Sequence, residues 1–212
     1  MSEPERVVHA SVQTRAGTAA LGDLAPADID AVVRYWHGGV ADLEFLGIDP
    51  ALLGTPEDTR QRLLRAIRCG DRYQRSLAFA ITLDGDLVGY TLLNRYTPDV
   101  NHSHWHIIAP DVRAAGISTA LYPYRIRMYF ELASMARLIH QTRTRNVGVN
   151  RMLDKYVPVA ETRYVERPDG VAAPGEFHLR YVRPADVPDF FAKAGTLTSA
   201  LARRGFAADT TR

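Results

Sequence analysis

Residues 102–121 read HSHWHIIAPDVRAAGISTAL, and this stretch carries the strongest structural signal in the chain. A strand pattern over 102–109 is followed by a proline turn, by the small residues of 113–118 and by a helical pattern that continues to about Ala136. Small residues between a strand and a helix leave backbone N–H groups uncovered at the positive end of the helix dipole. The turn therefore predicts a phosphate or pyrophosphate site, although the same residues would also suit a merely tight connection.

The segments on either side predict a mixture of helices and strands. Other helices are expected over 26–36, 55–68 and 147–156. Other strands are expected over 76–83, 86–95, 137–142, 162–166 and 177–182. Thr55 and Pro56 suit the N-cap and first position of a helix, and Asp84-Gly85 is a strong hairpin signal. The order of these elements argues for the α+β class with one mixed sheet.

The composition is that of an ordinary globular protein with one domain or at most two. The 212 residues include 26 basic and 24 acidic side chains, and 46% of the residues are apolar. Arginines and carboxylates are interspersed, so no nucleic-acid partner is expected. There is no apolar run of about 20 residues, and Met1–Arg6 lacks the features of a signal peptide, so a cytosolic protein without a membrane partner is expected. Cys69 is the only cysteine, which excludes an internal disulfide.

The run from Pro110 to Leu121 resembles the acetyl-CoA signature of the Gcn5-related N-acetyltransferases, the GNAT superfamily. That signature is Arg/Gln-x-x-Gly-x-Gly/Ala after a strand and a proline-bearing turn. Arg113 and Gly116 match it, whereas Ser118 replaces the second small residue and would add a hydroxyl to the phosphate site.

Two further segments, 86–90 and 142–155, are similar to the family's third strand and to its later strand-loop-helix element. The resemblance covers roughly residues 17–183, and its pattern is closest to the ribosomal-protein acetyltransferases. It implies a single α+β GNAT domain whose mixed, mostly antiparallel sheet is flanked by helices and contains a splayed strand pair that binds acyl-CoA. Residues 1–16 are expected to be an N-terminal extension. Residues 184–212 are expected to be a helical tail that packs on the domain or forms a homodimer.

The resemblance implies an acyl-CoA-dependent N-acyltransferase, with acetyl-CoA as the default co-substrate and direct attack by a primary amine. It places the pyrophosphate on the turn and the thioester carbonyl against the backbone of the preceding strand. The expected CoA-binding residues are Ile107, Ile108, Arg113, Ala114, Ala115, Gly116, Ile117, Ser118, Thr119 and Asn146. Many members carry a tyrosine acid where this chain has Leu153. Tyr156, a water or no group would replace it, and no dedicated acid is expected.

His102, His104 and His106 alternate along the predicted strand, so its two-residue period puts all three on one face. An ammonium group with a reference pKa near ~10 needs a general base before it can attack, and a histidine with a reference pKa near ~6.5 suits that task. His104 and His102 are predicted together as candidates for the base, and His106 as a wall of the pocket. The alternative is that all three are half-buried strand residues with satisfied hydrogen bonds.

Two other classes of function use the same residues. His-x-His-x-His on a strand is typical of metal sites in β-barrels, but no glutamate follows within a few residues and the element order is not all-β, so no metal is expected. A GNAT-like binding module without catalysis is the other alternative. Such a module would show a damaged CoA loop, and this loop is intact.

The acceptor side of the cleft is expected near the first two helices. The expected acceptor-binding residues are Tyr35, Trp36, Glu44, Phe45 and Arg95. Glu44 could also deprotonate a cationic amine, whereas Arg95 could face an anionic acceptor. Aromatic residues at helical spacing are equally typical of a core, and a glutamate of a solvated surface. A small-molecule amine is favoured over a protein N-terminus.

Overall fold

The computed structural model describes residues 6–67, 76–97, 99–168 and 170–195, with only the backbone of Arg95 and Tyr96. The strands are β1 (Val8–Thr14), β2 (Gly17–Asp23), β3 (Ser76–Leu83), β4 (Asp86–Thr97), β5 (Val100–Ile107), β6 (Arg137–Arg143), β7 (Glu161–Val165) and β8 (Gly175–Val182). The α-helices are α1 (Ile29–His37), α2 (Leu43–Leu46), α3 (Pro50–Leu53), α4 (Pro56–Ile67), α5 (Ile117–Leu132) and α6 (Val147–Leu153). The 3-10 helices are η1 (Pro26–Asp28), η2 (Pro110–Val112) and η3 (Pro184–Asp186), and a further helix covers 187–195.

The described strands form an eight-stranded sheet in the order β1-β2-β3-β4-β5-β6-β8-β7. Every neighbouring pair is antiparallel except β5 and β6, which are parallel. The predicted α+β class with a mixed, mostly antiparallel sheet is therefore confirmed. The hairpin of β3 and β4 turns at Asp84 and Gly85, whose φ angles of 51° and 96° lie in the left-handed region that a tight hairpin turn requires.

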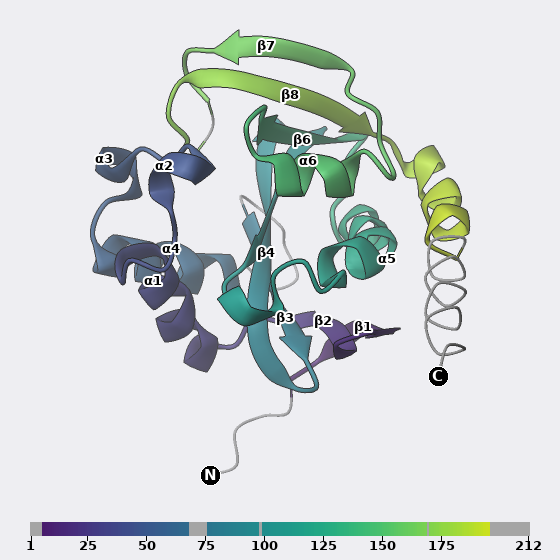
Figure 1. The fold of residues 1–212 in the computed structure, drawn as a ribbon, viewed down its shortest axis with the longest axis horizontal. Helices are drawn as coiled ribbons and strands as arrows, with labels where there is room; N and C mark the ends of the chain where they lie inside the picture. Colours follow the sequence, from purple (N-terminus) through teal and green to yellow (C-terminus); the bar gives the residue numbers. More distant parts are fainter. Residues whose placement is uncertain (1–5, 68–75, 98, 169, 196–212) are drawn as a thin grey trace, which may run out of the picture.

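Helices cover both faces of the sheet (Figure 1). On one face, α1 and α4 pack against Ala80 and Tyr90. On the other face, α5, α6 and the helix over 187–195 enclose a second core that contains Phe79 and Tyr129. Phe79 and Ala80 belong to different cores because successive strand residues point to opposite faces.

The two parallel strands separate soon after they meet. Pairing between β5 and β6 covers only residues 100–102 and 137–139, although β5 continues to Ile107 and β6 to Arg143. Beyond the paired residues the two strands leave a gap in the middle of the sheet. This is the splayed pair that the family resemblance implies.

The structure also shows elements that the sequence patterns did not predict. Residues 8–14, within the expected N-terminal extension, form the edge strand β1 and pair with β2. The short helices α2 and α3 occupy a segment with no predicted structure. Helix α5 ends at Leu132, before the predicted end near Ala136. No helix in the described part of the chain is long and apolar enough to span a membrane.

Candidate active site

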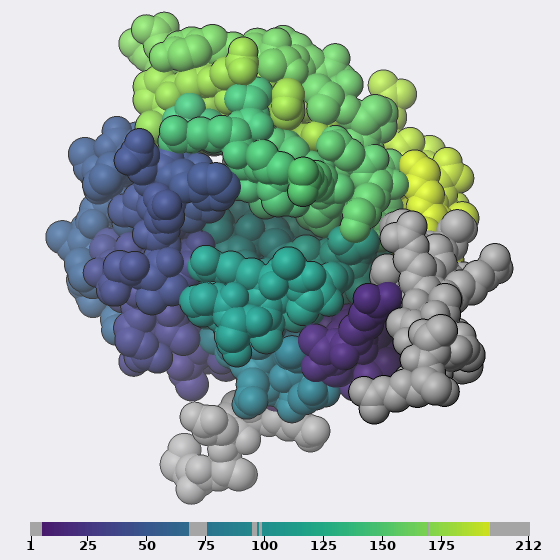
Figure 2. Space-filling view, in the orientation of Figure 1, coloured from purple at the N-terminus to yellow at the C-terminus, as the bar shows by residue number. Residues whose placement is uncertain are grey.

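The gap between β5 and β6 opens into a cavity of about 740 Å³, a volume typical of ligand-binding pockets. Its lining comes from both separated strands, from the neighbouring β3 and β4, from each of the helices α1 to α6, and from residues 170–172. Figure 2 shows the surface hollowed between the blue α2–α3 segment and the green α6 segment. The cavity therefore lies where the splayed strands and the helical layer meet.

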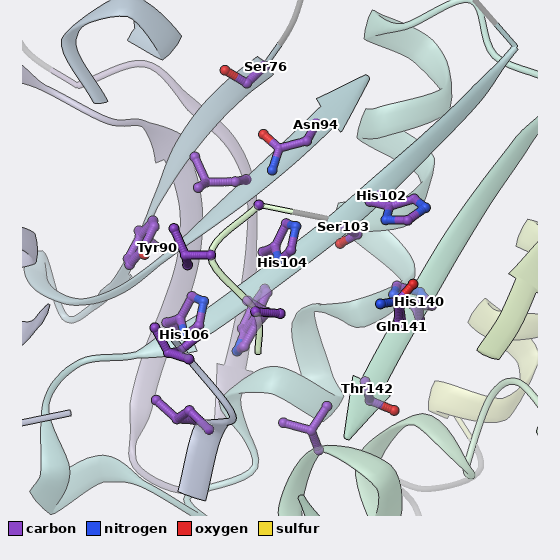
Figure 3. A pocket seen from close by; sticks show the side chains of 18 of the residues that line it. Ser76, Tyr90, Asn94, His102, Ser103, His104, His106, His140, Gln141 and Thr142 are labelled. Atoms are coloured by element: carbon purple, nitrogen blue, oxygen red, sulfur yellow. The ribbon is translucent and has the colours of Figure 1, made fainter. Parts of the chain in front are cut away.

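The three histidines of β5 line this cavity together. Figure 3 shows them in a row along the strand, with His104 between His102 and His106. The predicted common face is therefore present, and it points into the cavity. His104 is half-buried, whereas the exposed fraction of His102 is only 7%.

His106 forms part of an aromatic wall. Its ring stacks on Tyr90, with 5.3 Å between centroids, and meets the edge of Trp36 at 4.8 Å. The Trp36 indole N–H donates a hydrogen bond of 2.7 Å to the Tyr90 hydroxyl, which fixes both rings. The position of His106 agrees with the expected role of a wall residue.

Burial keeps His102 and His106 neutral at physiological pH. It lowers the pKa of His102 to about 4 and that of His106 to about 3, where the nearby His104 adds to the effect. Burial, together with the positive charge of Arg125, also lowers the pKa of His140 on β6. A lower pKa means a weaker base, so His102 is less suited to proton abstraction than its position on the strand suggests.

We expect the protein to lose stability as the pH falls from 7 to 5. In this range the unfolded chain protonates its histidines near pH 6.5, while folded His102 and His106 stay neutral down to about pH 4 and 3. The unfolded state then binds more protons, and each histidine reduces the unfolding free energy by on the order of 1–2 kcal/mol. Thermal unfolding followed by circular dichroism should show Tm falling with pH, and the slope should be smaller in His102→Asn. A Tm that is constant from pH 7 to pH 5 would contradict the burial of these groups.

The turn before α5 has the geometry of an anion site. Ala114 and Gly116 have φ angles of 66° and 84°, and Gly116 is the N-cap of α5. The first N–H groups of a helix have no acceptor within it, and they point out of its positive end. A Cβ at Gly116 would meet no atom within 4 Å, so the space in front of the turn is open. The expected residues Ala115, Ile117, Ser118 and Thr119 are the neighbours of Gly116 in this turn, and the Ala115 N–H already donates to Val112 O at 3.2 Å.

The two isoleucines expected at the thioester differ in their backbone. The Ile108 N–H donates to Val88 O at 2.9 Å and is therefore already occupied. Ile107 pairs with Gly89 in the same ladder, and because strand N–H groups alternate in direction, its N–H faces the gap. Arg113 folds back toward this strand, with its Nε 3.4 Å from Ile107 O.

The start of α6 is held by two asparagines. Asn146, which is expected to bind CoA, is the N-cap, accepts from the Val149 N–H at 3.4 Å, and lines the cavity. The buried Asn150 was not predicted: its Oδ1 accepts from Thr142 Oγ1 at 2.6 Å and its Nδ2 donates to Arg143 O at 2.8 Å. Its place in the segment that resembles the family element is the only sequence signal for it.

Tyr156 has a structural task that explains its position. Pro123 lies inside α5 and has no N–H, so Thr119 O loses the donor that a regular helix would supply. The Tyr156 hydroxyl donates to that carbonyl at 2.7 Å. Tyr156 is also buried and does not line the cavity, whereas Leu153 does. These contacts hold the Tyr156 hydroxyl on α5 and away from the cavity.

The residues expected on the acceptor side do not all reach the cavity. Trp36 lines it, and Tyr35 is buried against Trp36. Glu44 and Phe45 lie on α2 with exposed side chains and are not part of the lining. Arg95 pairs with Asn101 through the backbone, and its side chain lies outside the described part.

A roof over the cavity comes instead from neighbouring residues. Ile48 forms a bridge with Ala172, Asp49 N–H donates to Val171 O, and Ala173 N–H donates to Gly47 O, both at 2.8 Å. Ile48 and Val171 line the cavity beneath this connection. Sequence patterns could not reveal it, because it joins two loops more than a hundred residues apart.

The described residues contain no group of three or more His, Cys, Asp or Glu side chains placed to hold a metal ion. Within that part of the chain, the row of histidines on β5 therefore has no completed ligand set. Cys69 lies outside the described residues.

No protein-family model matches the sequence, and the comparison with curated proteins found no match either. Solved structures are similar in fold. RimJ of Mycobacterium smegmatis, in complex with CoA-disulfide, has 19% identity and a TM-score of 0.68, over 93% of this chain and 95% of that chain. The RimL ribosomal L7/L12 alpha-N-protein acetyltransferase has 12% identity and a TM-score of 0.67, over 86% and 97%. The microcin C7 self-immunity acetyltransferase MccE, in complex with acetyl-CoA and AMP, has 13% identity and a TM-score of 0.59, over 80% and 97%.

Proposed function

We propose that this chain, which has the fold of the GNAT acetyltransferases, is an acyl-CoA-dependent N-acyltransferase that acts on a primary amine. Acetyl is the simplest acyl group for this chemistry. The observation that carries the proposal is the gap between the splayed strands β5 and β6, which holds the histidines of β5, while the open turn before α5 follows β5 directly in the chain. CoA phosphates would lie against the turn, and the Ile107 N–H would hold the thioester carbonyl.

His104 is the proposed general base, either directly or through one water. It lines the cavity between His102 and His106 and is only half-buried, so a substrate in the cavity can reach it. The amine nitrogen attacks the thioester carbonyl carbon, His104 takes the proton that nitrogen loses, and the C–S bond breaks. CoA leaves as a thiolate, which solvent protonates because no acid side chain stands at Leu153.

The acceptor we propose is a small amine, with the free N-terminus of a peptide as the alternative. The roof formed by residues 47–49 and 171–173 covers one side of the cavity and limits the size of the entering group. RimL, which has a similar fold, is a ribosomal L7/L12 alpha-N-protein acetyltransferase. The acceptors to be screened therefore include peptides with a free N-terminus.

Calorimetric titration of the full chain with acetyl-CoA and CoA tests the cofactor, and we expect micromolar binding that is indifferent to a chelator. A thiol-release assay against aliphatic amines, amino acids and short peptides then identifies the acceptor. Absence of heat with every CoA compound would overturn the proposal. Binding without turnover of any amine would instead indicate a non-catalytic binding module.

A further inference from the structure

Arg125 is a buried cation without a carboxylate partner. It lies on α5, its exposed fraction is 1%, and its guanidinium stands 4.5 Å above the Trp105 ring. Its hydrogen bonds go to the neutral hydroxyl groups of Thr91, at 3.4 Å, and Tyr129. Among the described residues no Asp or Glu forms an ion pair with it. Burying a charge without a counter-charge is unfavourable, so this arrangement requires an explanation.

Arg180 shows how the same fold treats a comparable arginine. It is also fully buried, but its Nη2 donates to Asp154 Oδ1 at 2.6 Å and its Nη1 to Asn150 Oδ1 at 3.0 Å. The difference is that Arg125 lines the cavity and Arg180 does not. A ligand in the cavity can therefore supply the negative charge that the protein supplies to Arg180.

Donor atoms without acceptors gather around Arg125. Its Nε and the Trp105 Nε1 are both buried and have no hydrogen-bond partner in the described part of the chain. Trp105 lines the cavity as well, and Ser103 lies two residues before it on the same face of β5. Unsatisfied buried donors are rare, and here two of them adjoin an open cavity.

The charged residues that line the cavity also favour an anionic ligand. The arginines in its lining are Arg62, Arg65, Arg125 and Arg143, and no Asp or Glu is among the described lining residues. A carboxylate is the ligand group that pairs best with a planar guanidinium. The cavity is therefore suited to an anion at its inner end.

Arg125 stands over the ring of Trp105, and the place of Trp105 along β5 indicates which molecule carries that anion. Trp105 lies on β5 between Ile107 and His102, and His102 is the last residue of β5 that pairs with β6. If the thioester carbonyl is held by the Ile107 N–H, an acyl chain that continues into the gap reaches Trp105 after two residues, or about 6.6 Å. That span suits a chain of about four or five carbons with a terminal carboxylate.

We propose that Arg125 binds the free carboxylate of a dicarboxylic acyl group, such as succinyl or glutaryl, in its CoA thioester. This inference rests on the proposed function and specifies its acyl donor. The amine nitrogen forms a bond to the thioester carbon, the C–S bond breaks, and CoA leaves with one proton restored to its thiol. The distal carboxylate stays on the amide product, and Arg125 and Trp105 hold it without taking part in bond changes.

Calorimetric titration of the full chain with succinyl-CoA and butyryl-CoA tests this. The two acyl chains have the same number of carbons, and only the terminal group differs. We expect succinyl-CoA to bind roughly tenfold to a hundredfold more tightly, because a charged hydrogen bond in a dry site is gained. In Arg125→Met the preference should disappear while the affinity for CoA itself stays unchanged.

Arg127→Met is the matched control, because Arg127 lies on the same helix with a half-exposed side chain beside Glu131. It should keep the preference for succinyl-CoA, and Arg125→Lys should keep part of it. Equal affinity of the wild-type protein for both thioesters would overturn the assignment of the acyl group and leave the proposed function intact. The finding that Arg125 binds a carboxylate of the acceptor, and not of the acyl group, would have the same consequence. Failure to bind CoA or either thioester would overturn both proposals.

Discussion

His104→Ala is expected to lower kcat by about 10²- to 10⁴-fold while changing the Kd for the acyl-CoA by less than about twofold. The substitution removes the imidazole that would take the proton of the attacking amine. It leaves the turn before α5 and the Ile107 N–H untouched, and these are the groups proposed to bind CoA. Steady-state kinetics with the best acceptor, together with calorimetric titration, separates the two effects.

Two other histidines serve as comparisons for this variant. His178→Ala should keep the wild-type kcat, because His178 lies on β8, is hydrogen-bonded to Thr162 and does not line the cavity. His102→Ala should lose less than about tenfold, since burial lowers the pKa of His102 to about 4 and makes it a weak base. If His104→Ala keeps its full rate from pH 6 to pH 9, the base lies elsewhere.

Gly116→Leu is expected to weaken CoA binding by about a hundredfold or more. Gly116 has a φ of 84° and open space around the position of a Cβ, so the new side chain would project into the region proposed for the pyrophosphate. Loss of two hydrogen bonds between backbone N–H groups of the turn and the charged phosphates accounts for a decrease in CoA affinity of this size. The measurement is the Kd for CoA by calorimetry.

Gly39→Leu separates backbone strain from the loss of the phosphate site. Gly39 has a φ of 77°, and a Cβ there would likewise meet no atom within 4 Å, so the left-handed strain of about 1–2 kcal/mol is the same in both variants. Both should show a similar decrease in Tm, and only Gly116→Leu should lose affinity for CoA. Unchanged CoA binding in Gly116→Leu would show that the turn is a connection and no phosphate site.

Much of the sheet could be predicted because its signals are local. Asp84 and Gly85 marked the hairpin of β3 and β4, and Thr55 marked the start of α4, where its Oγ1 accepts from the Asp58 N–H at 3.1 Å. Strand β1 was missed although residues 8–14 alternate between smaller apolar and polar side chains. An edge strand buries little apolar surface, so its pattern is weak.

The candidate site could be predicted only in part. The alternation of His102, His104 and His106 was enough to place them on one face, because the two-residue period is a property of any strand. Glu44 is a different case: nothing in its neighbourhood along the chain showed that α2 would direct it to solvent while Ile48 lined the cavity.

What can be read along the chain are features that depend on a few consecutive residues: strand and helix periods, caps, hairpin turns and the small-residue turn before α5. Features that depend on which distant segments meet required the folded molecule. Three features are of this kind. The Tyr156 hydroxyl donates to the carbonyl that Pro123 leaves without a donor, and Ile48 pairs with Ala172 over the cavity. Among the described residues, no carboxylate pairs with Arg125. The reason is physical: a periodic pattern specifies the direction of a side chain from its own backbone, whereas its partners depend on the packing of every element around it.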